Sequence, residues 1–220
     1  MKRIPRIQPG EVFTIESQAL SKMADLVDKK SFDAAVKVLV KAPRIAASGC
    51  GHTGIACMHF AHLMCCIERP ARFLSPAEAV HGGSGFLQKG DVMLVASRGG
   101  KTSELIPIVE ICRRKKVTVI CVTENLISPL ALNSDIVLGI TITREVDRDN
   151  QQGTTSFTVM CVLFDALQAA LIEKTNYRKE QFALIHPGGA VGELLNRNMT
   201  QESKVSQTKA GAASPGKKTK

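Results

Sequence analysis

The segment from Ser97 to Glu104 combines two adjacent glycines with hydroxyl residues and an acid. Glycine lets backbone N–H groups approach an anion closely, and Ser97 and Thr102 add hydroxyl donors. The segment follows the apolar run of residues 92–96, which predicts a strand, and it leads into a helix whose positive end would face the same place. These residue types suit the binding of one phosphate group.

The same segment contains Gly100-Lys101-Thr102, which matches the end of a nucleotide-binding P-loop. That pattern needs a further glycine five residues before Gly100, where this chain has Val95. Val95 belongs to an apolar run that predicts a strand, and no acidic residue suited to magnesium ends a nearby strand. A binding loop for ATP or GTP is therefore not favoured.

A second glycine loop, residues 49–54, has the spacing G-x-G-x-x-G of dinucleotide-binding proteins. Such proteins also carry an acid at the end of the second strand, which holds the ribose hydroxyls. The strand predicted at 71–74 ends without an acid, and Glu68 lies before it. NAD and FAD are therefore not favoured, and we predict no cofactor. The residues alone leave open that the serines and threonines of both loops merely cap helices.

Strands that alternate with helices predict parallel β-α-β units. Apolar residues at helical spacing predict two N-terminal helices within 11–41, with a break near Ser31. We therefore predict an α/β fold with a doubly wound, five-stranded parallel sheet and helices on both faces. The predicted strands are 44–48, 71–74, 92–96, 117–122 and 136–140; the predicted helices are 55–67, 103–115 and 155–174, shorter ones that start at Ser75-Pro76 and Ser128-Pro129, and one at the end of 181–195.

The composition indicates one globular domain, residues 1–200, followed by a basic tail. Residues 201–220 hold five lysines and one glutamate, which supply +4 of the chain's net charge of +9. The tail has almost nothing to bury, so we predict that it is disordered. Nucleic-acid binding would need a basic face with stacking aromatics. The chain has no Trp and one Tyr, so nucleic acid is not an expected partner.

No unbroken apolar run approaches the ~18 residues of a membrane span, and no apolar segment follows the basic N-terminus as in a secretory signal. The seven cysteines are an odd number and include no C-x-x-C pair, which is typical of a reducing compartment. His59 and His62 lack a further pair of ligands at metal-site spacing. We therefore expect a cytoplasmic protein without a metal site or a membrane partner.

Several motifs, in order and at matching spacing, resemble the sugar isomerase (SIS) domain family, and within it the arabinose-5-phosphate isomerase branch. The resemblance runs from about residue 12 to 196, without the C-terminal CBS domains usual in that branch. It implies a flavodoxin-like fold, a sugar-phosphate ligand, aldose–ketose isomerisation and homo-oligomers, either dimers or tetramers. The segments that carry it are 49–54, 76–82, 97–104, 123–125, 154–156, 164–167 and 182–189.

The chain departs from the pattern of that branch at several motif positions. The branch has Lys where this chain has His52, and an acid where it has Gly83. It has Ser where this chain has Gly99, and Thr where it has Phe157. These changes leave the sugar open, and they keep a non-catalytic sugar-phosphate sensor as the alternative function.

Isomerisation moves a proton between C1 and C2 of the sugar through an enediol, which needs a base and donors for the developing oxyanion. By resemblance, Glu104 is the base, and His81 and His186 relay a proton or open the sugar ring; His186 would reach a neighbouring subunit's site. His52 would donate to a sugar oxygen as a pH-dependent cation. The other predicted ligands of sugar or phosphate are Ser48, Gly49, Cys50, Gly51, Thr53, Ser97, Arg98, Gly99, Gly100, Thr102, Thr154, Thr155 and Ser156.

The sequence therefore favours an enzyme that interconverts an aldose phosphate and a ketose phosphate, of the arabinose-5-phosphate/ribulose-5-phosphate type. The presence of Glu104, His81 and His186 supports the enzyme. The loss of the lysine at His52 and of the acid at Gly83 supports the sensor. A third alternative is another reaction on the same scaffold, such as 3-hexulose-6-phosphate isomerisation or amino-sugar chemistry.

Overall fold

The computed structural model describes residues 7–197. These residues fall into two compact units, one that ends at Thr175 and one that begins at Asn176, and each is described by itself. The second unit contains α8 (Lys179–Ile185) and a further helix from residue 189. The predicted disordered tail, 201–220, lies outside the described residues. The single domain over 1–200 stays a prediction.

The first unit is built on five strands: β1 (Ile45–Ser48), β2 (Ala71–Phe73), β3 (Val92–Ala96), β4 (Thr118–Thr123) and β5 (Ile136–Gly139). They form one sheet in the order β2-β1-β3-β4-β5, and all four pairings are parallel. β1 and β3 are buried throughout, because helices cover both faces of the sheet. This burial explains why both strands are continuous apolar runs in the sequence. The predicted α/β class and parallel five-stranded sheet are confirmed.

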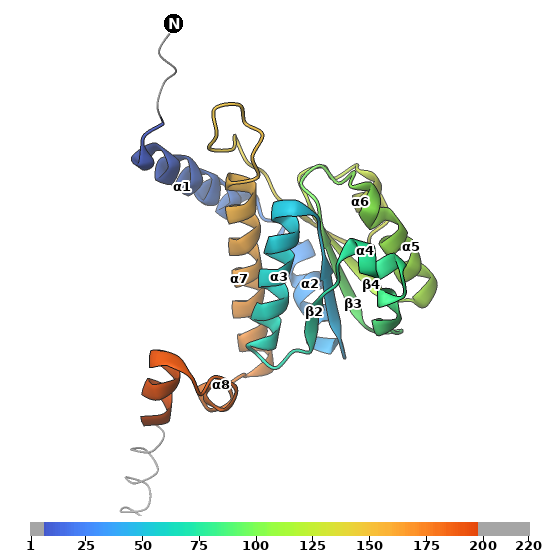
Figure 1. The fold of residues 1–220 in the computed structure, drawn as a ribbon, viewed down its shortest axis with the longest axis vertical. Helices are drawn as coiled ribbons and strands as arrows, with labels where there is room; N and C mark the ends of the chain where they lie inside the picture. The colour runs from blue at the N-terminus through green and yellow to red at the C-terminus, as the bar shows by residue number, and fades with distance from the viewer. Residues whose placement is uncertain (1–6, 198–220) are drawn as a thin grey trace, which may run out of the picture. The chain divides into compact units, whose positions relative to one another are not determined.

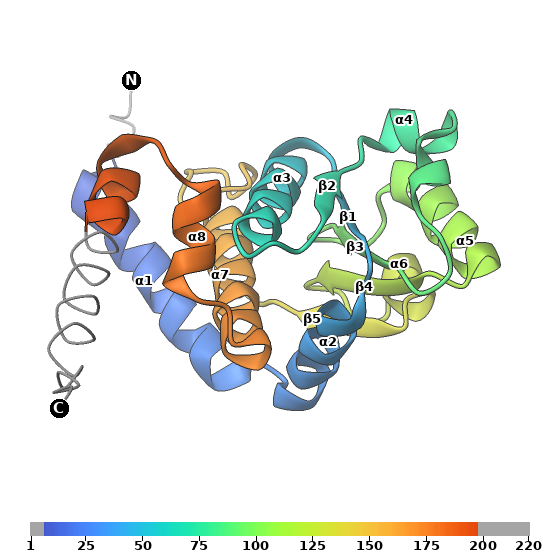
Figure 2. The same ribbon diagram turned by 90° about the horizontal axis from the view of Figure 1, so that it is seen from below.

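The helices of the first unit are α1 (Pro9–Leu26), α2 (Lys29–Lys41), α3 (Gly51–Cys65), α4 (Pro76–Val80), α5 (Ile106–Lys115), α6 (Pro129–Leu132) and α7 (Thr155–Thr175), with short 3₁₀ helices η1 (Gly83–Phe86) and η2 (Ser103–Leu105). α2, α3 and α7 lie on one face of the sheet, and α1 packs against α7 (Figure 1). α4, α5 and α6 lie on the other face (Figure 2). The largest side chains of the core on that second face include Leu105, Ile108 and Leu130.

Two helix boundaries differ from the prediction. The N-terminal helices break at Val27 and Asp28 rather than near Ser31, because the Asp28 carboxylate accepts hydrogen bonds from two N–H groups in the first turn of α2. α3 begins at Gly51 rather than at Ile55, so the second half of the glycine loop is the first turn of the helix. This earlier start brings the N-terminus of α3 directly to the end of β1.

Among residues 7–197, α7 is the one helix whose length and apolar composition would suffice to cross a membrane. Polar residues interrupt its apolar sequence, so α7 contains no unbroken apolar run long enough to span a membrane. Core helices of folded domains meet the same criteria. Since α7 packs against α1, α2 and α3, packing within the first unit explains its composition.

Candidate functional site

The strand order places a topological switch point at the carboxyl ends of β1 and β3. β1 continues into α3 on one face of the sheet, and β3 continues through η2 into α5 on the other face. Parallel sheets with the order 2-1-3-4-5 bind their ligands at this point, because the two connections leave in opposite directions. Both predicted glycine loops, 49–54 and 97–102, lie here. The structure therefore brings the two loops to one edge of the sheet.

The loop after β3 is held by its own hydroxyl groups. The side-chain oxygens of Ser97 and Thr102 are 2.8 Å apart, within hydrogen-bond distance. The N–H of Gly100 donates to the side-chain and backbone oxygens of Ser97, at 3.1 and 3.0 Å. In the described part of the chain, the N–H groups of Gly99, Lys101 and Thr102 donate to no protein atom. These three groups remain available to an anion.

Gly100 is required for the shape of this loop. Its backbone is left-handed, with φ +64°, a conformation that costs other residues about 1–2 kcal/mol. A Cβ atom at this position would overlap the Ser128 hydroxyl. That hydroxyl in turn accepts a hydrogen bond from the Ala131 N–H at the start of α6, at 3.3 Å. The loop is therefore packed tightly against the segment after β4, and left-handed residues in such loops are typical of anion-binding backbone.

The loop after β1 presents an uncapped helix end. Cys50 is the residue that precedes α3, and its side chain makes no capping hydrogen bond. The first N–H groups of a helix have no partner within the helix, and here they belong to Gly51, His52 and Thr53. Together with the positive pole of α3, they favour an anion or a polarised oxygen at this edge of the sheet.

Glu104 lies on η2, directly after the loop 97–102, which is called the phosphate-type loop from here on. Its side chain is exposed. Its own backbone N–H and the Ser103 hydroxyl, at 2.9 Å, lower the pKa of the carboxyl. Burial raises the pKa of the Cys50 thiol, and the negative charge of Glu104 raises it further. The predicted base therefore lies within electrostatic reach of Cys50 in the loop 49–54.

The structure brings two of the three predicted histidines to the same edge. His52 lies beside Gly153, just before α7, and its ring meets the ring of Phe157, in the first turn of α7, edge-on with centroids 6.4 Å apart. His81 is exposed at the end of α4, and α4 packs against η2, which carries Glu104. His186 belongs to the second unit, where its ring lies 4.9 Å from that of Phe182. The position of His186 relative to this edge stays a prediction.

Glu145 is a central residue that sequence reasoning missed. Its side chain is fully buried. One carboxylate oxygen accepts from the N–H groups of Thr154 and Ser156 at 2.9 and 3.1 Å, and the other from the Ser156 hydroxyl at 2.6 Å. The carboxylate thus occupies the N-terminus of α7, where helices bind anions. No local signal indicates this role, because an isolated acid in an irregular segment resembles a solvated one.

The contacts of Glu145 involve the segment 154–156, whose hydroxyl groups are predicted ligands of the sugar or phosphate. The hydroxyls of Thr154 and Ser156 donate to the Glu145 carboxylate, and it is this carboxylate that accepts from the N–H groups at the start of α7. The Thr155 hydroxyl is buried without a hydrogen-bond partner, as is the Ser48 hydroxyl at the end of β1. Buried hydroxyls are normally bonded, so Ser48 and Thr155 keep the capacity to bind a ligand or a water molecule.

Arg98, another predicted ligand, is engaged by the protein. Its Nε atom lies 2.9 Å from a Glu124 carboxylate oxygen, and one Nη atom lies 2.8 Å from a Glu145 carboxylate oxygen. The guanidinium therefore already has two negative partners.

Gly83, in the loop after α4 where the similar branch has an acid, is tightly surrounded in this chain. A Cβ atom at Gly83 would lie 2.6 Å from the carbonyl oxygen of Glu78 and 2.9 Å from the Leu74 side chain. Both contacts are shorter than real Cβ contacts. The backbone of this chain therefore has no room for the acid that the similar branch carries at position 83.

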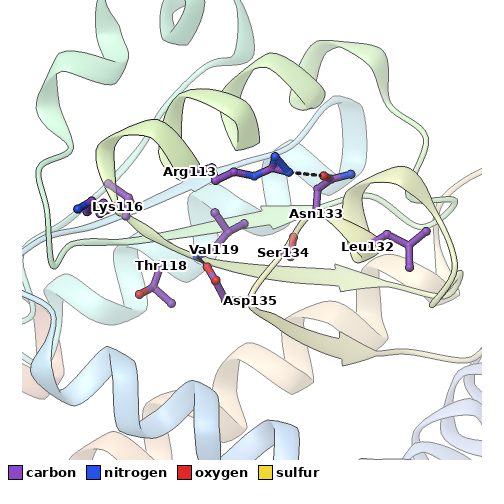
Figure 3. Close-up of a pocket in the computed structure, with 9 residues that line it drawn as sticks. Arg113, Lys116, Thr118, Val119, Leu132, Asn133, Ser134 and Asp135 are labelled. Carbon is purple, nitrogen blue, oxygen red and sulfur yellow. Dashed lines mark hydrogen bonds between the residues drawn. The ribbon is translucent and has the colours of Figure 1, made fainter.

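A polar cavity of about 390 Å³ lies elsewhere on the first unit, at the amino end of β4 (Figure 3). Its cations are Arg113, which donates to the Asn133 side-chain oxygen at 2.9 Å, and Lys116. α5 ends at this cavity, and the negative pole of a helix disfavours phosphate. None of the predicted site residues lines it. The cavity is formed by Arg113, Lys116, Val117, Thr118, Val119, Leu132, Asn133, Ser134 and Asp135.

Within residues 7–197, no three His, Cys, Asp or Glu side chains are grouped as metal ligands would be. His59 instead bonds to Asp165 on α7, at 3.2 Å. His62 bonds to Cys66, at 3.5 Å.

Residues 38–170 match the family model of the SIS domain. Among solved structures, the chain is similar to a Listeria monocytogenes protein to which sugar-phosphate isomerase activity is ascribed; the two are 37% identical, with a TM-score of 0.79 over 81% of this chain and 94% of that chain. It is also similar to the Escherichia coli CFT073 protein c3406, solved in complex with A5P, with 27% identity and a TM-score of 0.76 over 81% of this chain and 95% of that chain.

Among curated proteins, the chain is similar to arabinose 5-phosphate isomerase KdsD of Francisella tularensis, with 31% identity over 84% of this chain. The enzyme of that name from Pseudomonas aeruginosa is 37% identical over 69% of this chain. The chain spans 58% and 47% of the lengths of these two enzymes. The family model covers more than half of the chain, and it covers both glycine loops, Glu104 and Glu145. The chain therefore belongs to the SIS domain family.

Proposed function

We propose that this protein is a sugar-phosphate isomerase that interconverts arabinose 5-phosphate and ribulose 5-phosphate. The observation that carries the proposal is the placement of Glu104 directly after the loop 97–102, within electrostatic reach of Cys50 in the loop 49–54. The similarity to arabinose 5-phosphate isomerases, and to a structure in complex with A5P, supports this sugar.

The phosphate group is expected to bind the loop 97–102. The unpartnered N–H groups of Gly99, Lys101 and Thr102 would donate to its oxygens, and the Ser97 and Thr102 hydroxyls would complete the shell. The sugar would then extend towards the N-terminus of α3, whose first N–H groups favour a polarised oxygen. A phosphate held in this way fixes the distance between the sugar carbons and Glu104, which is the main contribution of a remote binding group.

Glu104 is the proposed base. Its carboxylate removes the proton from C2 of the aldose while O1 gains a proton, which gives the enediol. The same carboxyl then returns its proton to C1 while O2 loses one, which gives the ketose. His81 and His52 are the proposed donors and acceptors at O1 and O2, because both lie at the same edge of the sheet as Glu104. No net oxidation occurs, so the reaction needs no redox partner.

We also propose a homo-oligomer. α3 and α7 pack side by side, and Ile55, Met58 and Val162 on these helices are exposed although they are apolar. An apolar cavity of about 270 Å³ lies between α1 and α7. Exposed apolar surface of this kind is typical of contact surfaces between subunits. In such an oligomer, His186 of one copy would reach the site of a neighbouring copy, as the resemblance implies. A cytoplasmic location remains our expectation from the cysteine content.

A panel of pentose, hexose and heptose phosphates tests the function. We expect conversion of arabinose 5-phosphate to ribulose 5-phosphate, measured by the appearance of the ketose, together with a rise in Tm on binding. Conversion of a hexose phosphate alone would contradict the proposed sugar. A rise in Tm without conversion of any member would contradict the enzyme and support the sensor.

A further inference from the structure

Arg98 connects three segments at the carboxyl edge of the sheet. It belongs to the phosphate-type loop after β3. Its guanidinium reaches Glu124, after β4, at 2.9 Å, and Glu145, before α7, at 2.8 Å. The main chain of Arg98 also binds to the end of β4. Its carbonyl oxygen accepts hydrogen bonds from the Glu124 N–H at 2.9 Å and from the Thr123 hydroxyl at 3.0 Å. Side chain and backbone of Arg98 therefore hold the loop in one place.

The charges in this cluster argue against a direct contact between Arg98 and a phosphate. Two carboxylates already face one guanidinium. Glu145 is fully buried, and Arg98 is its one cationic partner within the described residues. If the guanidinium turned towards a phosphate, the buried Glu145 carboxylate would lose its cationic partner and keep only the N–H and hydroxyl donors at the start of α7, which is unfavourable.

Resting on the proposed sugar-phosphate ligand, we propose that Arg98 is a positioning residue of the phosphate loop and not a ligand of the phosphate. Its two ion pairs hold the loop so that the N–H groups of Gly99, Lys101 and Thr102 stay available to the anion. The anion is then bound by backbone and hydroxyl donors, and Arg98 acts on affinity through the shape of the loop.

The chain offers a matched control for the loss of such an ion pair. The Arg44 Nε atom lies 3.0 Å from a carboxylate oxygen of Asp91, and Asp91 is fully buried, as Glu145 is. The Arg44 and Arg98 side chains are similarly exposed, at 39% and 35%. Arg44 pairs with Asp91 at the amino end of β3, the opposite end from the phosphate loop. Arg44→Met therefore removes a comparable pair away from the candidate site.

The test is a double-mutant cycle of Arg98→Met and Glu124→Gln, with Arg44→Met as the control. Calorimetry gives the Kd of each protein for arabinose 5-phosphate and for inorganic phosphate, and kinetics give KM and kcat. We expect Arg98→Met and Glu124→Gln each to raise both Kd values by about 2- to 30-fold. The double variant should bind no more weakly than the weaker single variant, since both changes break one connection. KM should rise with Kd while kcat stays unchanged, and Arg44→Met should lower Tm without changing either Kd.

Three results would overturn the proposal. If Glu124→Gln left phosphate binding unchanged or tighter while Arg98→Met weakened it, Arg98 would be a direct ligand. If Arg98→Met lowered only Tm, as Arg44→Met does, its role would be purely structural. Inorganic phosphate is not turned over, so its Kd reports on the loop whether or not the protein is an isomerase. A wild-type protein that binds both ligands but does not convert arabinose 5-phosphate would contradict the proposed function and leave the proposal for Arg98 standing. A wild-type protein that binds neither ligand would overturn the proposal for Arg98 as well.

Discussion

Glu104 and Cys50 lie within electrostatic reach of each other: burial raises the pKa of the Cys50 thiol, and the negative charge of Glu104 raises it further. The two residues follow different strands, β3 and β1, whose connections leave the sheet towards opposite faces. The predicted base and the loop 49–54 therefore lie at the same carboxyl edge of the sheet.

The pH dependence of activity should report the environment of Glu104. Its backbone N–H and the Ser103 hydroxyl lower its pKa, so the carboxylate stays ionised to a lower pH than an ordinary glutamate. Activity that needs the ionised base is present above this lowered pKa and is lost as the pH falls through it. Ser103→Ala removes one of the two causes. We expect the acidic limb of kcat/KM to move to higher pH in Ser103→Ala, with Ser17→Ala on α1 as the control. A limb that stays in place would show that Ser103 does not set the pKa of the base.

The two glycines of the phosphate loop should differ in their tolerance of a side chain. At Gly100 a Cβ would overlap the Ser128 hydroxyl, and the left-handed backbone adds about 1–2 kcal/mol. At Gly99 a Cβ would meet nothing within 4 Å. The backbone cost alone should make Gly100→Ala lower Tm by about 2–8 °C, and the overlap with Ser128 should lower it further. Gly99→Ala should change Tm little. Equal Tm values for the two variants, measured by calorimetry, would contradict the described loop.

Restoring the acid of the similar branch at position 83 should destabilise this chain. A Cβ at Gly83 would lie 2.6 Å from the Glu78 carbonyl oxygen, whereas at Gly85 it would have open space. We expect Gly83→Asp to cost about 1–3 kcal/mol of the free energy of unfolding, as overpacking does. Gly85→Asp is the matched control and should cost much less. Urea titration of both variants measures the difference, and a stable, more active Gly83→Asp would contradict the packing of this loop.

The cysteines should differ widely in reactivity, because the thiolate is the nucleophile. Burial raises the pKa of Cys112 and of Cys121 to about 12 in each case. Cys65 is exposed on α3. We expect a thiol reagent at pH 8 to modify Cys65 first in the folded protein, as mass spectrometry of timed samples would show, and Cys65→Ser to remove the fastest phase. Modification of Cys112 or Cys121 at the rate of Cys65 would contradict their burial.

The elements of the sheet could be predicted from the sequence because their signals are local. β3 has the predicted bounds, since an apolar run between turn residues identifies a buried strand. The glycine loop that follows β3 is a local signal of the same kind, and its binding of phosphate remains a prediction. The start of α3 was placed too late, because glycines in a loop motif concealed the first turn of the helix.

The network around Arg98 could not be predicted, because its partners are distant in the sequence. Glu124 belongs to a segment of the resemblance, 123–125, that has no assigned role, and Glu145 resembles an ordinary acid; only the fold brings them to one guanidinium. An arginine in a glycine loop suggests an anion ligand, whereas the carboxylates that already neutralise it are visible only in three dimensions. The position of His186 remains a prediction, since it lies in the second unit.

The most direct test of the proposed chemistry is proton exchange at C2 of arabinose 5-phosphate in deuterium oxide, followed by proton NMR. The wild-type protein and Glu110→Gln, an exposed acid on α5, should both introduce deuterium at C2 of the aldose. Glu104→Gln should lower this rate by about 100- to 10,000-fold while binding is retained. Exchange in Glu104→Gln at the wild-type rate would contradict the role of Glu104 as the base. No exchange in the wild-type protein, with clear binding of the sugar, would contradict the isomerase itself.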